Sequence, residues 1–241
     1  MPFFIAYDSA NDRMYATNFG SSTASAIDTT SNTVIDTDPS TSEIDPITVG
    51  TRPVGIAYDS INENMYMTNF GDFPGSVSVI DTTTNTVIDT DPSTSEIDPI
   101  AVGSLPTDIA YDPINQDIYV TNQGSGSVSV IDTTTNTEIE TITVGDTPIG
   151  IDYDPINHRM YVTNSMDGTV SHKSLPSSWT TTTKFKRHYY DYCQQQQWSY
   201  HHCRYKWSKR TKDNRTTKYT KKEFDIATIT SNEKIPVGNF N

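Results

Sequence analysis

Apolar and polar residues alternate with a period of two in short segments of the first 171 residues. Residues 76–80, Ser-Val-Ser-Val-Ile, show this pattern, and residues 127–131 repeat it. Such alternation turns one face of a strand toward a core. Asp-Pro, Gly-Ser and Thr-Thr-Asn sequences end these segments, and their side chains can hydrogen-bond their own backbone in turns. No sustained helical period occurs before residue 172, so the pattern predicts short strands joined by turns.

The predicted strands belong to a repeat, which is visible as short sequence motifs, here called words, that recur in a fixed order. The word Tyr-x-Thr-Asn occurs four times and follows the word Ile-x-Tyr-Asp at a constant spacing of eight residues. A third word, Ile-Asp-Thr-Thr, precedes an Asn-Thr pair, and a Val-Gly pair closes the unit before a proline. The first word begins at Tyr15, Tyr66, Tyr119 and Tyr161, and the second contains Tyr7, Tyr58, Tyr111 and Tyr153. The chain is therefore an array of one structural unit.

The repeat length predicts the architecture. Successive tyrosines of the second word are 51, 53 and 42 residues apart, and near-identical acidic inserts at 36–46 and 89–99 lengthen the first two units. A unit of about 42 residues has the size of a four-stranded propeller blade. Such a sheet is unstable alone, and radial stacking buries its faces. We predict an all-β, incomplete or open β-propeller of four-stranded antiparallel blades; a linear solenoid is the alternative.

Together these words resemble the YVTN family of β-propeller repeats, which is known from archaeal surface-layer proteins and related bacterial secreted or periplasmic propellers. The resemblance covers residues 1 to about 171. It implies blades at about 1–50, 51–103 and 104–145, with a fourth that begins at 146. It also implies an extracellular or cell-surface protein, although the chain as written shows no signal peptide, since its first residues align with the first strand of a blade.

Charge divides the chain into two parts. Residues 1–171 contain 25 acidic residues and three arginines, a net charge of −22, whereas the remainder has a net charge of +9. The acidic part would repel phosphates, so we expect no nucleic-acid partner. Both cysteines lie after residue 171, so neither disulfides nor thiolate metal sites support the propeller. No apolar run is long enough to span a bilayer.

Residues 172–222 form a basic segment that departs from the repeat. A metal site, a nucleic-acid-binding arm and a disordered polar tail are alternatives for it. A one-base shift of reading frame explains it better, because the shifted codons of residues 171–174 and 193–199 can recover repeat words. Residues 223–241 then include the end of a fifth blade. If the protein contains this segment as written, we expect about three and a half blades, which would form an open arc or self-associate to complete a propeller.

Each motif has a structural and a functional interpretation. We expect the Tyr-x-Thr-Asn tyrosines to pack between blades, and the repeated asparagines and aspartates to close turns by side-chain to backbone hydrogen bonds. The acidic inserts could offer oxygen ligands to calcium, but they lack the pattern of an EF-hand, which favours solvated loops. His158 is expected at the surface. We assign no catalytic, cofactor-binding or metal-binding residue, because phosphate-loop, nucleophile-elbow and zinc-protease motifs are absent.

We therefore expect a non-enzymatic propeller that serves as a surface-layer-like structural or binding scaffold. Its partner would be a protein or a glycan, contacted through the loops that differ between copies at residues 70–75, 123–126 and 165–168. The alternative is a lactonase- or dehydrogenase-like propeller with its site at the channel mouth. The near-identity of the blades argues against that alternative, since a catalytic site needs blades that differ.

Overall fold

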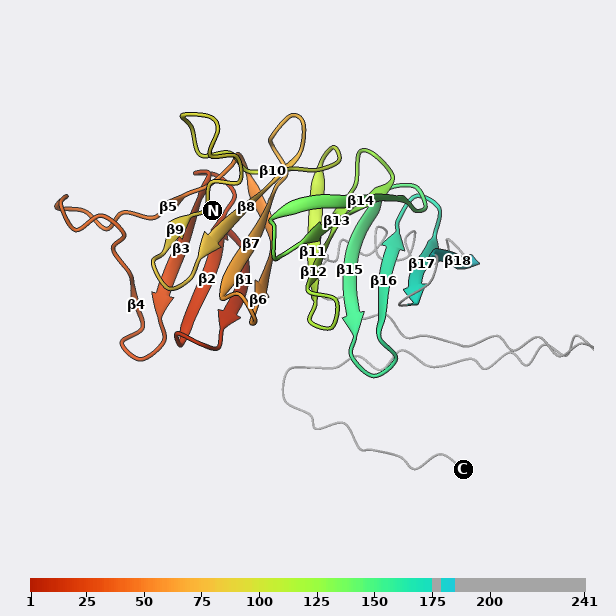
Figure 1. Ribbon diagram of the computed structural model, residues 1–241, viewed down its shortest axis with the longest axis horizontal. Helices are drawn as coiled ribbons and strands as arrows, with labels where there is room; N and C mark the ends of the chain where they lie inside the picture. Colours follow the sequence, from red (N-terminus) through yellow and green to blue (C-terminus); the bar gives the residue numbers. More distant parts are fainter. Residues whose placement is uncertain (175–178, 185–241) are drawn as a thin grey trace, which may run out of the picture. The chain divides into compact units, whose positions relative to one another are not determined.

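The computed structural model describes residues 1–174 and 179–184, all within the compact unit Met1–Asp191 (Figure 1). Every regular element in these ranges is a β-strand. The strands form four antiparallel sheets that follow one another along the chain. Among the described residues, no helix is long and apolar enough to cross a bilayer. The predicted all-β propeller of four-stranded antiparallel blades is confirmed.

Each sheet is one blade, and its strands are ordered from the inside outward as they occur in the sequence. Blade 1 contains β1 (Pro2–Asp8), β2 (Arg13–Asn18), β3 (Thr23–Asp28), β4 (Thr33–Val34) and β5 (Ile47–Thr48). Blade 2 contains β6 (Pro53–Asp59), β7 (Asn64–Asn69), β8 (Ser76–Asp81), β9 (Thr86–Val87) and β10 (Ile100–Ala101). Blade 3 contains β11 (Pro106–Asp112), β12 (Asp117–Asn122), β13 (Ser127–Asp132) and β14 (Thr137–Thr143). Blade 4 contains β15 (Pro148–Asp154), β16 (Arg159–Asn164), β17 (Thr169–Ser174) and β18 (Trp179–Lys184).

The acidic inserts interrupt the outermost strand of blades 1 and 2. In blade 3 the continuous strand β14 pairs with both ends of β13, with a bulge between Val130 and Ile131. In blade 2 the same two positions are held by separate strands, because β9 pairs at Ile80 and β10 pairs at Val77. The insert leaves the sheet at the position of the bulge and returns to the same edge. The inserts therefore enlarge the outer rim without changing the four-strand plan.

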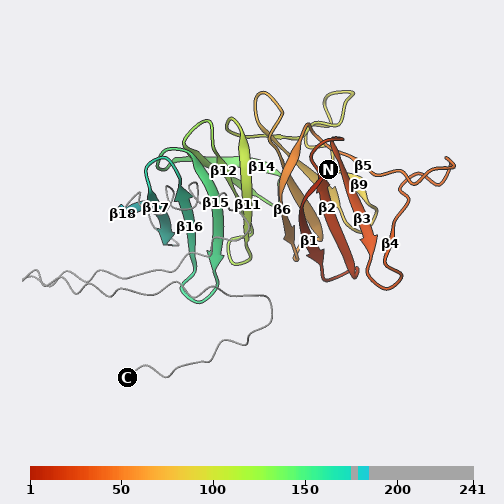
Figure 2. The ribbon, with the colours of Figure 1, turned by 180° about the vertical axis from the view of Figure 1, so that it is seen from behind.

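The blades pack through their broad faces, and in the described part each blade packs only against its neighbours in sequence (Figures 1 and 2). The inner strands β1, β6, β11 and β15 lie next to one another, as propeller geometry requires. We call the face that a blade turns toward the next blade its leading face, and the opposite one its trailing face. Between blades 2 and 3, for example, Tyr66 and Val79 of the leading face join Ile118 and Ile131 of the trailing face in one apolar core.

Blade 4 has more structure than the sequence suggests. Its third strand β17 extends to Ser174, and β18 pairs with it from Trp179 onward, so the described residues form four complete sheets. The expectation of about three and a half blades is therefore wrong, because antiparallel pairing uses main-chain groups and does not need the apolar alternation of the other outer strands. The remainder of the 172–222 segment and the fifth blade expected at 223–241 lie outside the described residues.

Candidate functional site

The tyrosines of the first three Tyr-x-Thr-Asn words lie in blade interfaces. Tyr15, Tyr66 and Tyr119 are fully buried, and the hydroxyls of Tyr15 and Tyr66 donate to Oδ1 of Asn85 and Asn136 in the following blade, each at 2.5 Å. Burial raises the pKa of the Tyr66 hydroxyl, so it stays protonated and able to donate. The prediction that these tyrosines pack between blades is confirmed, and they do not line a ligand channel.

The threonine of the word has a role that sequence reasoning did not assign. In each blade its Oγ1 accepts the backbone N–H at the bulge of the inner strand, as in Gly55 N to Thr68 Oγ1 at 2.8 Å and Asp108 N to Thr121 Oγ1 at 2.9 Å. In the first three blades the same hydroxyl donates to a carbonyl of the next blade. These bonds run from Thr17 to Val54 O (3.0 Å), from Thr68 to Thr107 O (2.9 Å) and from Thr121 to Ile149 O (3.2 Å). One hydroxyl therefore closes the bulge and connects two blades.

The repeated asparagine does not close a turn with its side chain, so that part of the prediction is wrong. The Nδ2 of Asn69 donates to the hydroxyls of Ser76 and Ser78 on the neighbouring strand, at 2.8 and 2.9 Å. Its side chain is buried against Gly50, where a Cβ atom would lie only 2.3 Å from Asn69 Nδ2. The asparagine therefore ties two strands together and requires a residue without a side chain at the preceding Val-Gly pair.

The repeated aspartate caps the turn between the first two strands, as predicted. Asp59 Oδ1 accepts the N–H groups of Ile61 and Asn62, at 2.9 and 3.3 Å, and its Oδ2 accepts from Asn62 Nδ2. Burial raises the pKa of Asp59, but the hydrogen bonds from Asn62 and from the backbone of the turn lower it by more, so the pKa lies below its usual value. Asn62 also donates to Thr133 Oγ1 in the next blade at 3.1 Å. The turn is thereby part of the blade interface.

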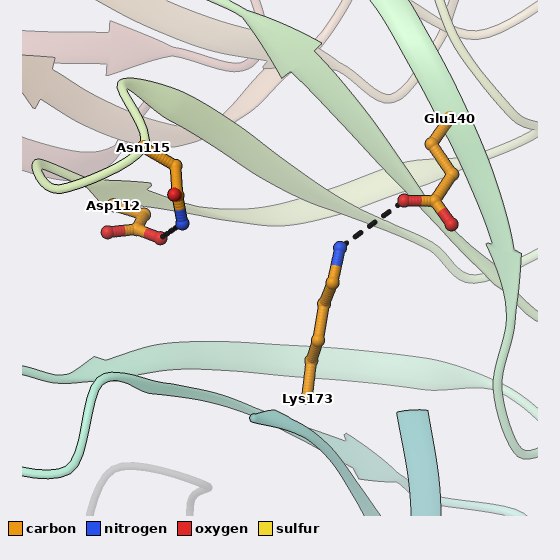
Figure 3. Close-up of polar contacts among 4 residues, drawn as sticks. All are labelled: Asp112, Asn115, Glu140 and Lys173. Carbon is orange, nitrogen blue, oxygen red and sulfur yellow. Dashed lines mark hydrogen bonds and ion pairs between the residues drawn. The ribbon is translucent and has the colours of Figure 1, made fainter. Parts of the chain in front are cut away.

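The interface between blades 3 and 4 departs from this pattern (Figure 3). Lys173 occupies the β17 position that Ile131 holds in blade 3, since each pairs with the second residue of its neighbouring strand. Its Nζ lies 3.3 Å from Glu140 Oε2 and 5.4 Å from the ring centre of Tyr119. The Tyr119 hydroxyl is buried and has no hydrogen-bond partner in the described part of the chain. An ion pair and a cation–π contact therefore replace an apolar contact here.

Carboxylates also gather near this interface. Asp117 pairs across the strands with Asp132, and burial together with the charges of Asp112 and Asp132 raises its pKa to about 6. Asn115 donates to Asp112 Oδ2 at 2.8 Å, as the asparagines of the first two turns do in their own blades (Figure 3). In the described residues this asparagine makes no bond like that of Asn62 to the next blade. The group is an acidic cluster inside a blade interface and not an open cleft.

The inner strands also carry carboxylates, but these are engaged in backbone contacts. Asp108 Oδ1 accepts the N–H of Ile109 at 2.9 Å, and its Oδ2 accepts the N–H of Ile151 in the next blade at 3.0 Å. Burial raises the pKa of Asp108. No group of three or more His, Cys, Asp or Glu side chains in the described residues is placed to hold a metal ion. His158 is exposed, as expected, and its Nδ1 lies 3.1 Å from the Tyr153 hydroxyl.

The acidic inserts use their carboxylates to hold their own loops. Asp36 Oδ1 accepts the N–H groups of Asp38 and Asp45, at 3.1 and 3.2 Å, and Asp38 Oδ1 accepts from Ser40. The hydrogen bonds from Ser40 lower the pKa of Asp38. The second insert has the same bonds at Asp89 and Asp91. This arrangement favours the solvated-loop interpretation over calcium binding, and it leaves an isoleucine, Ile44 or Ile97, 62% exposed in each insert.

The loops between the second and third strands are the regions that differ between blades. In blade 2 this loop presents Phe73, which is 89% exposed beside a cis peptide bond to Pro74, and in blade 4 it presents Met166, which is 60% exposed. The base of each loop is anchored, since Asp72 Oδ1 accepts the N–H of Thr51 at 2.8 Å and Asp167 Oδ2 accepts that of Asp146 at 2.6 Å. Hydrogen bonds at the base of each loop therefore hold an exposed apolar side chain at one end of the propeller.

Comparison with known proteins identifies the fold but does not assign the chain to a family. No protein-family model and no curated protein matches the chain. Hydrazine synthase of Kuenenia stuttgartiensis is 19% identical with a TM-score of 0.57, over 71% of this chain and 44% of that one. A nidogen/laminin complex structure is 15% identical (TM-score 0.55; 78% and 64% covered), and the RRP9 WD40 repeats are 11% identical (0.58; 75% and 50%).

These identities show a shared fold and nothing finer. WD40 repeats build propellers of four-stranded blades, which agrees with the sheets described above. The chain spans about half the length of the solved structures that it matches, between 44% and 64% in these three. The resemblance to the YVTN family stays a prediction.

Proposed function

We propose that this protein is a non-enzymatic β-propeller scaffold of the YVTN type, which acts at the cell surface and binds a protein or a glycan through its loops. The proposal is supported by a difference between the residues that repeat in every blade and those that vary between blades. The repeated Tyr, Thr, Asn and Asp side chains are engaged within the blades and their interfaces. The loops that differ between blades are the residues left to recognise a partner.

Loop chemistry favours a partner with an apolar or ring-bearing surface. Phe73 and Met166 project from the same end of blades 2 and 4, on loops anchored by Asp72 and Asp167. Aromatic side chains and methionine are enriched at the centres of protein interfaces. The faces of sugar rings also pack against aromatic rings. The strongly acidic character of residues 1–171 agrees with a partner other than nucleic acid.

A binding experiment with a matched control tests this proposal. The full chain and its Phe73→Ser and Ile114→Ser variants are applied to a panel of purified glycans and cell-envelope proteins. Ile114 is 55% exposed in a turn at the opposite end of the strands. We expect Phe73→Ser to weaken the strongest interaction about 10-fold and Ile114→Ser to leave it unchanged. Equal effects of the two variants, or no binding by the parent chain, would contradict loop recognition.

The enzymatic alternative and the location are tested separately. Turnover of lactones or dye-coupled oxidation of alcohols by the purified chain would contradict a non-enzymatic scaffold. Cell fractionation of the natural source with an antibody against the chain tests the surface location, and recovery in the cytosol alone would contradict it.

A further inference from the structure

The two ends of the blade row expose surfaces that are buried everywhere else in the described part of the chain. On the trailing face of blade 1, Ile5 is 56% exposed, whereas its equivalent Ile56 is half-buried and Ile109 and Ile151 are 5% and 8% exposed. On the leading face of blade 4, Tyr161 is 37% exposed, whereas Tyr15, Tyr66 and Tyr119 are fully buried. The four described blades thus leave one face of each kind against which no other described blade packs.

We propose that these two faces bind each other between two copies of this chain, so that blade 4 of one copy packs on blade 1 of the other as one more blade interface. A second copy is the expected partner, because the interfaces between blades inside the chain already join faces of these two kinds. The interfaces between blades 1 and 2 and between blades 2 and 3 each join a leading face to a trailing face through the same set of hydrogen bonds. The two exposed faces carry the complementary halves of that set.

The tyrosine and threonine bonds define the inner part of the proposed interface. Tyr15 and Tyr66 donate to the asparagine four residues after the aspartate of the third word in the next blade, and the equivalent asparagine in blade 1 is Asn32. The threonine hydroxyls donate to the carbonyl of Val54 and its equivalents, a position held by Phe3 in blade 1. We therefore expect bonds from Tyr161 to Asn32 Oδ1 and from Thr163 to Phe3 O of the second copy.

The turn residues define the outer part. Asn11 and Asn62 donate to Thr82 and Thr133 of the next blade, so Asn157 should donate to Thr29 Oγ1 of the second copy.

Such an interface joins unlike surfaces, so it forms a ring if the rotation closes and an open series if it does not. The four described blades of two copies would together make eight, which lies within the range of closed propellers. Since the described part of each copy is strongly acidic, long-range repulsion opposes the association. Salt screens this repulsion, so we expect the association to strengthen as salt rises.

Analytical ultracentrifugation of the full chain and three variants tests the proposal. The parent chain should sediment at twice its 26.9 kDa, while Ile5→Arg and Tyr161→Arg should each raise the dissociation constant at least about 100-fold and leave single chains. Ile114→Arg is the matched control, because Ile114 is 55% exposed and lies on neither face, and it should not change the mass. Circular dichroism confirms that each variant is folded.

A mixture of the two face variants separates this interface from nonspecific association. Ile5→Arg keeps an intact leading face and Tyr161→Arg an intact trailing face, so their mixture should form a pair through one intact interface. Recovery of the double mass only on mixing supports the proposal. A single-chain mass for the parent protein, or variants that pair alone as well as together, would overturn it.

Discussion

The interface between blades 2 and 3 and that between blades 3 and 4 are built on the same backbone, and each has an apolar core, but they differ in chemistry at two positions. In the first, Ile131 lies in the apolar core and Tyr66 donates to Asn136. In the second, Lys173 takes the position of Ile131, and the Tyr119 hydroxyl has no partner among the described residues. The comparison shows that strand pairing and inter-blade chemistry are separable. Main-chain pairing maintains the sheet, whereas the repeated side chains determine how strongly adjacent sheets bind.

The largest effect should follow removal of a buried tyrosine from a regular interface. Tyr66→Ala should lower the free energy of unfolding by about 3–5 kcal/mol, since it leaves a cavity and an unpaired Asn136. Tyr119→Ala should cost a similar amount through the cavity alone. Tyr161→Ala, the same residue of the word at 37% exposure, should cost less than about 1 kcal/mol. Urea denaturation of the three variants checks this order, and equal losses would contradict it.

A smaller effect should follow a change at the glycine that faces the repeated asparagine. A Cβ atom at Gly103 would lie 2.6 Å from the side chain of Asn122, so Gly103→Ala should destabilise the protein by about 1–3 kcal/mol through overpacking. Gly20→Ala serves as the control, because its Cβ atom would meet nothing closer than 3.4 Å. A thermal melt in which both variants match the parent would show that the asparagine can move aside.

The irregular interface should gain stability when its apolar residue is restored. Lys173→Ile should raise the free energy of unfolding by about 1–2 kcal/mol, because an isoleucine side chain gains burial energy and Glu140 is 54% exposed and needs no partner. The expected rise in melting temperature is a few degrees for a chain of this size. Lys173→Gln, which removes the charge without restoring the apolar contact, should give no such gain. A loss of stability in Lys173→Ile would show that the ion pair is worth more than the apolar contact.

The smallest effect concerns pH. The pKa of Asp117 is raised from 3.8 to about 6 by burial and by Asp112 and Asp132, so the folded protein holds this proton more tightly than the unfolded chain. The contribution of Asp117 to stability is therefore favourable below pH 3.8 and is lost as the pH rises through 6. The free energy of unfolding that Asp117→Asn gains over the parent should be larger above pH 6 than below pH 3.8. Urea midpoints at several pH values check this, and a difference independent of pH would contradict the raised pKa.

The fold could be predicted from the sequence because the same residues recur in every repeat unit. A word such as that at Tyr66 recurs at a fixed place, and the alternation in residues 76–80 defines which side of a strand is buried. The role of Thr68 could not be predicted in this way, because its hydroxyl joins a bulge to a carbonyl 39 residues away in another blade. Only the packing of adjacent blades brings those two groups together. The asparagine was misinterpreted for a related reason, since its partners are hydroxyls on a neighbouring strand and not its own turn.

The irregular interface also bears on the hypothesis of a changed reading frame. Lys173, the residue that breaks the apolar pattern, lies within the codons where the shifted frame can recover a repeat word. The structure does not describe most of the later residues, so the hypothesis stays a prediction. Resequencing of the gene tests it, and a shifted frame with stop codons or without repeat words between residues 172 and 222 would exclude it.

The most direct test of the account is a double-mutant cycle across one regular interface. Its central claim is that the repeated words stabilise the propeller by specific bonds between blades, such as that from Tyr66 to Asn136 at 2.5 Å. The free energy of unfolding of Tyr66→Phe, Asn136→Ala and the double variant should give a coupling energy of about 1 kcal/mol. Tyr119→Phe should be nearly neutral, since that hydroxyl has no partner in residues 1–174 and 179–184. A coupling energy of zero between Tyr66 and Asn136 would contradict the account.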